Sequence, residues 1–261
     1  MRVINIISNF ALYLRHFVRI LIIVVNIIKL SRLKIMKAVY TLLFSFLMFS
    51  TIVTTQGCCG KDCKTAECPT DTVSKKMLLI VDAQYDFING SLAVKGAPAI
   101  MDSLAQYIAA QDTNLYAQIV MTADYHPANH SSFKDYGGIW PVHCVQNTHG
   151  GAIYQPILDA VKRHHADAPI LTKGDSVEVD EYSIMANAAS KAKLTGMIDS
   201  LGIEEIYVAG LCGDYCVGNS IKDLVAAGYG KKIRVLTRFI GNIDDGSTLR
   251  KIISDNALKE E

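Results

Sequence analysis

From Met77 onward, short apolar runs alternate with segments in which apolar residues recur every three or four positions. The apolar runs are typical of buried strands and occupy residues 77–81, 117–122, 169–172, 206–209 and 233–236. Helical patterns lie between them, at Ile100, Leu104 and Ile108 and over residues 153–163, 185–201 and 217–227. This alternation predicts a three-layer α/β/α domain over residues 77–258, with helices on both faces of a central, mostly parallel sheet.

Reactive side chains come where the predicted strands end. Asp82 follows the first strand, Asp124 the second and Lys173 the third, and Cys216 comes shortly after the fourth. Each of these residues alone is typical of a cap, a solvated charge or a buried thiol. Because the functional crevice of an open parallel sheet lies beyond the carboxyl ends of its strands, we expect the four side chains to meet at one rim.

Cys216 is the candidate nucleophile. The stretch 208–217 runs from an apolar strand through Gly210 and Gly213 directly into a helix, with Cys216 at the turn. The N-terminus of a helix carries unpaired N–H groups and a partial positive charge, which favour a thiolate over a thiol. The pattern therefore predicts an activated cysteine.

A second group of residues has the composition of a metal site. Asp124 and His126 are separated by one residue, and His143 follows in a loop stiffened by Pro141. A carboxylate with two imidazoles suits Zn, Fe or Mn, so we expect one divalent ion, with zinc favoured.

The first 76 residues differ in composition from the rest. Met36-Lys37 and the uncharged run 38–53 are typical of a secretory signal, and Gly57-Cys58 gives it the form of a lipoprotein signal over residues 36–58. Residues 1–35 would then precede the true start, although a genuine N-terminal membrane anchor remains the alternative. The polar segment 59–76 reads as a tether. We expect an exported protein, periplasmic or anchored to a membrane through Cys58.

Several stretches together resemble the nicotinamidase/pyrazinamidase family of isochorismatase-like cysteine hydrolases. They run in family order over about 140 residues: 79–87 (LIVDAQYDF), 124–133 (DYHPANHSSF), 140–145 (WPVHCV), Lys173-Gly174 and 210–217 (GLCGDYCV). The resemblance implies hydrolysis of nicotinamide, and of pyrazinamide, through a thioester on cysteine, in NAD salvage.

The resemblance also implies a role for each matching residue. Cys216 would be the nucleophile, Asp82 the general acid and base, and Lys173 the cation beside them. The N–H groups of Cys212 and Cys216 would form the oxyanion hole, next to a cis peptide between Leu211 and Cys212. Cys212 departs from the family, which more usually has alanine there. The remaining assignments are Phe87 and Trp140 at the pyridine ring, Asp124, His126 and His143 on the metal, and His130 left open as a further ligand.

Charge and composition narrow the partners. The 26 basic and 25 acidic residues give a net charge of +1 without a basic patch, so we expect a small-molecule substrate and no nucleic acid. A homo-oligomer is left open. The alternatives are a related amidase acting on carbamoyl or ureido substrates, an isochorismatase, which would need neither the cysteine nor the metal ligands, and an inactive binding module displayed on a membrane.

Overall fold

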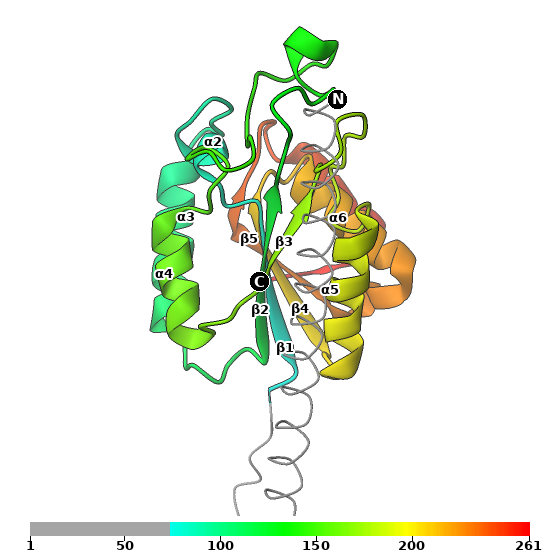
Figure 1. The fold of residues 1–261 in the computed structure, drawn as a ribbon. Helices are drawn as coiled ribbons and strands as arrows, with labels where there is room; N and C mark the ends of the chain where they lie inside the picture. The colour runs from blue at the N-terminus through cyan, green and yellow to red at the C-terminus, as the bar shows by residue number, and fades with distance from the viewer. Residues whose placement is uncertain (1–73) are drawn as a thin grey trace, which may run out of the picture. The chain divides into compact units, whose positions relative to one another are not determined.

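The computed structural model describes residues 74–261, which are built on a six-stranded, entirely parallel sheet (Figure 1). The spatial order of the strands is β3-β2-β1-β4-β5-β6. Their bounds are β1 Lys76–Val81, β2 Gln118–Asp124, β3 Ile170–Lys173, β4 Glu205–Leu211, β5 Ile233–Gly241 and β6 Lys259–Glu260. The predicted α/β fold with a parallel sheet is confirmed, and the carboxyl ends of all strands lie at one end of the domain.

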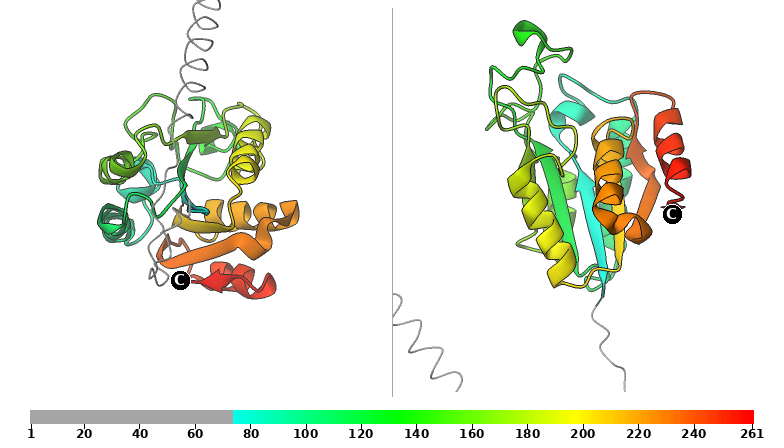
Figure 2. Two further views of the ribbon diagram at one scale, coloured as in Figure 1. Left: turned by 90° about the horizontal axis from the view of Figure 1, so that it is seen from below. Right: turned by 90° about the vertical axis from the view of Figure 1, so that its right-hand side faces the viewer.

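Helices cover both faces of this sheet (Figure 2). One face carries α3 (Ala97–Ala110), α4 (Gln155–His164) and the short α2 (Tyr85–Ile88), and the other carries α5 (Ala188–Ser200), α6 (Cys216–Leu224) and α7 (Ser247–Asp255). Alternate residues of β1 serve the two sides. Leu78 and Ile80 pack in the first core, and Met77, Leu79 and Val81 pack in the second. A strand buried on both faces explains why β1 reads as an unbroken apolar run.

Helix α3 shows how the sequence pattern fixes the orientation of a helix on the sheet. Its buried residues lie at the spacing that puts side chains on one face of a helix: Ala97, Met101, Leu104, Ala105 and Ile108. The helix begins after Gly96, whose φ of 79° lies in the left-handed region that glycine adopts without strain.

The observed elements differ from the predicted ones mainly at their ends. β2 and β3 run to Asp124 and Lys173, so these two residues end their strands instead of following them. β5 continues to Gly241, five residues beyond its predicted end at Leu236, because its later residues still pair with β4. The prediction missed the outermost strand β6, the helix α7 and the single turn α2, which are short or lie at the edge of the sheet.

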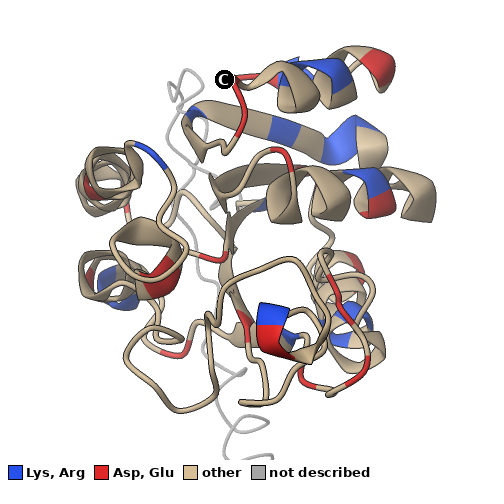
Figure 3. Ribbon diagram, turned by 90° about the horizontal axis from the view of Figure 1, so that it is seen from above, with Lys and Arg blue, Asp and Glu red and all other residues tan. Residues whose placement is uncertain are grey.

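The signal, the tether and Cys58 lie outside the described residues. Between residues 74 and 261, no helix combines the length and apolar character needed to cross a membrane. Basic and acidic side chains are interspersed over the ribbon when it is seen from the carboxyl end of the strands (Figure 3).

Candidate active site

Lys173 is the charged centre of the site. Its side chain is completely buried at the end of β3, with Nζ 2.9 Å from Asp82 Oδ2 and 3.5 Å from Cys216 Sγ. Nζ also pairs with Asp124 Oδ1. Burial alone would lower the pKa of Lys173, but the two carboxylates outweigh it and hold that pKa well above its ordinary value. The four residues predicted to share a rim therefore meet around one ammonium group.

Asp82 is held by β2 as well as by Lys173. It follows β1 with a φ of 47°, and its backbone N–H donates to Thr122 Oγ1 over 3.2 Å. The Thr122 hydroxyl in turn donates to Asp82 Oδ1 over 2.5 Å. Burial raises the pKa of Asp82 above its usual value, against the opposing effects of Lys173 and Thr122. Asp82 is thus a stronger base than an exposed aspartate.

Cys216 is the first residue of α6 and is 5% exposed. Burial raises the pKa of its thiol well above the ordinary value, and the nearby Lys173 ammonium lowers it by less. Burial therefore opposes the stabilisation of the thiolate that the helix N-terminus is expected to provide. The thiol needs a base, and Asp82 contacts the same ammonium.

The backbone around Cys216 leaves two donors free. The peptide bond between Leu211 and Cys212 is cis, which confirms that expectation. The Cys212 carbonyl accepts hydrogen bonds from the N–H groups of Tyr215 and Val217. Within residues 74–261, the N–H groups of Cys212 and Cys216 donate to no protein acceptor. They have the free hydrogen-bonding capacity that an oxyanion hole requires.

The three predicted metal ligands come together beside Lys173. One ligand atom from each of Asp124, His126 and His143 lies within 4.8 Å of the others, and all three residues are buried. His126 Nδ1 pairs with the Gly174 carbonyl at 2.9 Å, and His143 Nδ1 pairs with the Pro141 carbonyl at 2.8 Å. These bonds fix each imidazole so that Nε2 is available to a cation.

The pKa shifts of Asp124 and His143 suit a cation, whereas burial lowers the pKa of His126 and Asp124 raises it by more. Burial would raise the pKa of Asp124, but the Lys173 ammonium and His126 hold it well below its usual range. Burial lowers the pKa of His143, which favours the neutral imidazole that binds metals. An ionised carboxylate and two oriented imidazoles fit a zinc, iron or manganese ion.

His130, which the sequence left open, has both ring nitrogens occupied. Nδ1 lies 2.7 Å from Ser132 Oγ, and Nε2 lies 3.1 Å from the Val179 carbonyl. The ring stacks on His126 with centroids 4.1 Å apart. His130 thus packs against a candidate ligand, and its ring also lies close enough to His126 and Asp180 to form a candidate ligand group with them.

A pocket opens onto the thiol and the histidines. Phe87 and Trp140 line it as the resemblance implied, and so do Tyr182 and Tyr215. Trp140 Nε1 donates to Tyr182 Oη over 3.0 Å, and its ring meets Tyr215 edge-on at 5.0 Å. The pocket thus has an aromatic wall that suits a flat ring.

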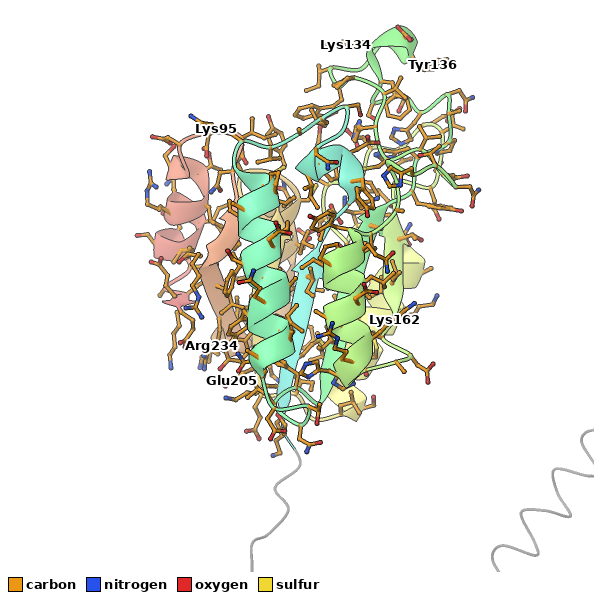
Figure 4. All side chains as sticks on the ribbon, turned by 90° about the vertical axis from the view of Figure 1, so that its left-hand side faces the viewer. Lys95, Lys134, Tyr136, Lys162, Glu205 and Arg234 are labelled. Atoms are coloured by element: carbon orange, nitrogen blue, oxygen red, sulfur yellow. The ribbon has the colours of Figure 1, made fainter. Side chains whose placement is uncertain are left out.

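The long connection between β2 and α4 lies at the end of the domain that holds the pocket. Figure 4 shows Lys134 and Tyr136 on the projecting turn η1 (Lys134–Tyr136), at the end of the domain opposite Glu205 and Arg234. Bridges between His126 and Val145 and between Phe133 and Trp140 fold this connection on itself. A loop of irregular structure thereby delivers both histidine ligands and the tryptophan.

Sequence reasoning gave no role to two side chains that hold the site. Gln84 is buried and bonds both the N–H and the carbonyl of Asp124 at 2.8 Å. Thr122 bonds Asp82, as described above. Gln84 lies within a matching stretch, so a polar residue directly after a buried strand was the available signal, whereas Thr122 reads as an ordinary strand residue.

Comparison with known families decides the assignment. Residues 76–238 match the model of the isochorismatase domain. The chain belongs to the isochorismatase-domain family.

Members of this family that resemble the chain include named enzymes. A nicotinamidase from Escherichia coli (strain K12) is 33% identical over 181 residues, covering 62% of this chain and 81% of that protein. The chain is accordingly a hydrolase of the isochorismatase-domain family.

Solved structures of the family agree in fold. A pyrazinamidase of Pyrococcus horikoshii in complex with zinc has a TM-score of 0.60 at 27% identity, covering 72% of this chain and 98% of that one. PnC1 from L. infantum in complex with nicotinate has a TM-score of 0.62 at 28% identity, covering 73% and 94%. The match extends over nearly the whole length of both structures, so the similarity concerns the catalytic domain.

Proposed function

We propose that this hydrolase converts nicotinamide to nicotinate and ammonia, and also accepts pyrazinamide, in the salvage of NAD. The observation that carries the proposal is the position of Lys173, 2.9 Å from Asp82 and 3.5 Å from the Cys216 thiol, beside a buried metal-ligand group. The similarity to a nicotinamidase, to a zinc-bound pyrazinamidase and to a nicotinate complex supports this substrate class.

In the first step Asp82 removes the proton of the Cys216 thiol, and Sγ forms a bond to the carboxamide carbon. Lys173 lowers the cost of this transfer because its ammonium lies against both groups and stabilises the thiolate. The carbonyl π electrons move to oxygen, and the N–H groups of Cys212 and Cys216 stabilise the resulting oxyanion.

In the second step the C–N bond breaks. Asp82 returns its proton to the leaving nitrogen, which departs as ammonia and leaves a thioester on Cys216. Asp82 then takes a proton from water, whose oxygen attacks the thioester carbon. Return of that proton to Sγ restores the thiol and releases nicotinate.

The ring is bound away from these reacting groups. Phe87 and Trp140 contact its faces. Asp124, His126 and His143 would hold a divalent ion, which would supply a Lewis acid for the pyridine nitrogen. This division of labour predicts that the cysteine drives turnover and the metal-ligand group drives binding.

Two variants test the division. Cys216→Ala should release almost no ammonia from nicotinamide yet still bind it, whereas His126→Ala should weaken binding while Cys216 remains open to alkylation. Ammonia release measures turnover, and the fluorescence of Trp140, the one tryptophan of the chain, reports binding. An active Cys216→Ala enzyme would mean that a metal-bound hydroxide attacks instead.

The same assay separates the alternative functions. A related amidase would release ammonia from carbamoyl or ureido compounds in preference to nicotinamide. A binding module would bind a ligand and release none.

A further inference from the structure

Glu181 is a pocket residue to which none of these steps gives a role. It lies on the connection between β3 and α5, and it lines the pocket. Glu181 Oε2 accepts the Gly174 N–H over 2.8 Å and the Asn187 side-chain amide over 3.0 Å. A charged acceptor with two donors is a strong local anchor.

Glu181 holds the N–H of Gly174, and the carbonyl of the same residue, on the following peptide, orients His126. The carbonyl of Gly174 pairs with His126 Nδ1 at 2.9 Å. Gly174 has a φ of 62°, and a Cβ on it would lie 2.6 Å from His126 Nδ1. The Gly174 backbone thus passes close against the imidazole, so a small rotation of that backbone would turn the ring that faces Asp124.

Asn187, the other partner of Glu181, connects the Gly174 backbone to helix α5. Asn187 is the N-cap of α5, where its side-chain oxygen accepts the Ser190 N–H over 3.1 Å. The chain of bonds runs from the start of α5 through Asn187 and Glu181 to Gly174 and ends on His126. A rigid helix end can therefore fix the direction of a metal ligand.

We propose that Glu181 is a positioning residue for the metal ligand His126. By holding the N–H of Gly174 it fixes the backbone of that residue, whose carbonyl keeps the Nδ1 side of the imidazole engaged and Nε2 directed at the cation. This inference rests on the metal group of the proposed function. Groups that orient a metal-binding histidine typically contribute 10-fold or more to metal affinity.

The test is the affinity of the metal-stripped full-length protein for Zn²⁺, measured in competition with a fluorescent chelator. Glu181→Ala should bind Zn²⁺ roughly tenfold more weakly. Glu181→Gln keeps an acceptor oxygen and should bind as the parent does. Glu178→Ala removes an exposed charge from the same connection and is the matched control.

The melting temperature of Glu181→Ala without metal shows whether this variant folds. If it does not fold, a second variant tests the same inference. Asn187→Asp keeps the N-cap acceptor but places a second carboxylate against Glu181. Added negative charge near a cation would by itself strengthen binding, so weaker Zn²⁺ binding in this variant reports displacement of Glu181.

Three results would overturn the inference. The first is an unchanged Zn²⁺ affinity in both Glu181→Ala and Asn187→Asp. The second is an equal loss of Zn²⁺ affinity in Glu181→Ala and Glu181→Gln, which would indicate that the charge of Glu181 matters and its position does not. The third is a loss of Zn²⁺ affinity in Glu178→Ala equal to that in Glu181→Ala. If the parent protein binds no Zn²⁺, the metal group of the proposed function fails and this inference fails with it.

Discussion

A single ammonium group compensates two buried carboxylates in this site. Asp82 and Asp124 are both buried, and Lys173 contacts both. Without that cation the two carboxylates would repel each other in a desolvated site, and one would take up a proton.

Lys173→Met should therefore lower kcat by about 100-fold or more, because Asp82 could no longer accept the thiol proton beside a stabilised thiolate. Nicotinamide binding should change much less, since the ring contacts remain. Removal of one partner of a buried ion pair should also lower the free energy of unfolding by about 3 kcal/mol. Ammonia release, ligand titration and urea unfolding measure the three effects.

The exposed Lys231→Met is the control for this change. A Lys173→Met enzyme with nearly unchanged kcat would contradict the role assigned to Lys173, whatever its stability.

Thr122 sets the acid limb of the pH profile. Its hydroxyl bonds the Asp82 carboxylate and so lowers the pKa of Asp82 against the effect of burial. Asp82 must be ionised to accept the thiol proton, and activity falls as pH drops through its pKa. Thr122→Val removes the bond, raises that pKa further, and should move the acid limb of kcat/KM to higher pH.

The profile of kcat/KM against pH measures this shift. Thr195→Val removes an exposed hydroxyl on α5 and should leave the profile unchanged. An acid limb that stays in place or moves to lower pH in Thr122→Val would show that another group controls it.

At the scale of elements, each of four consecutive strands supplies a group to the site at its carboxyl end. This convergence depends on the close packing of β4 against β1. Gly210 has a φ of 122°, and a Cβ there would clash with the Val81 carbonyl. The residue after Val81 is Asp82, so the contact lies directly beneath the site.

Gly210→Ala should consequently lower the free energy of unfolding by about 2–4 kcal/mol and reduce activity, because β4 must move away from β1. Gly196→Ala is the paired control. Gly196 lies inside α5 with open space around its Cβ direction, so alanine should stabilise the helix by about 1 kcal/mol. Urea unfolding of both variants checks the contrast, and equal effects would contradict the packing argument.

At the scale of the molecule, the start of β1 and the pocket lie at opposite ends of the domain. β1 begins at Lys76, at the amino end of the sheet, while the pocket lies beyond the carboxyl ends of the strands. A chain beginning at residue 74 should fold and hydrolyse nicotinamide at the rate of the full chain. Inactivity of this fragment would show that the first 73 residues contribute to the site.

The lipoprotein signal stays a prediction, because residues 36–58 lie outside the described part. The mature protein should begin at Cys58 and partition into detergent, and Cys58→Ala should release or mislocalise it. N-terminal sequencing and phase separation of cell extracts measure this. A soluble protein that retains residue 1 would contradict it.

The sequence by itself determined the parallel α/β fold and the residues that meet at the rim. Buried strands and amphipathic helices leave a local periodicity, and in a parallel sheet every strand end faces the same way. Asp82, Asp124, Lys173 and Cys216 could therefore be placed together without coordinates. The edge elements β6 and α7 escaped because the strand is only two residues long and the helix follows a pattern too short to stand out.

Only the tertiary structure decided the chemical state of that rim. Whether Cys216 rests as thiol or thiolate depends on how completely water is excluded and how near Lys173 lies, and neither quantity has a sequence signature. The same holds for His130, whose ring nitrogens pair with Ser132 and Val179. It also holds for Glu181, which is connected to His126 through the backbone of Gly174. Desolvation and hydrogen-bond direction are set by neighbours distant along the chain, so they appear only once the chain has folded.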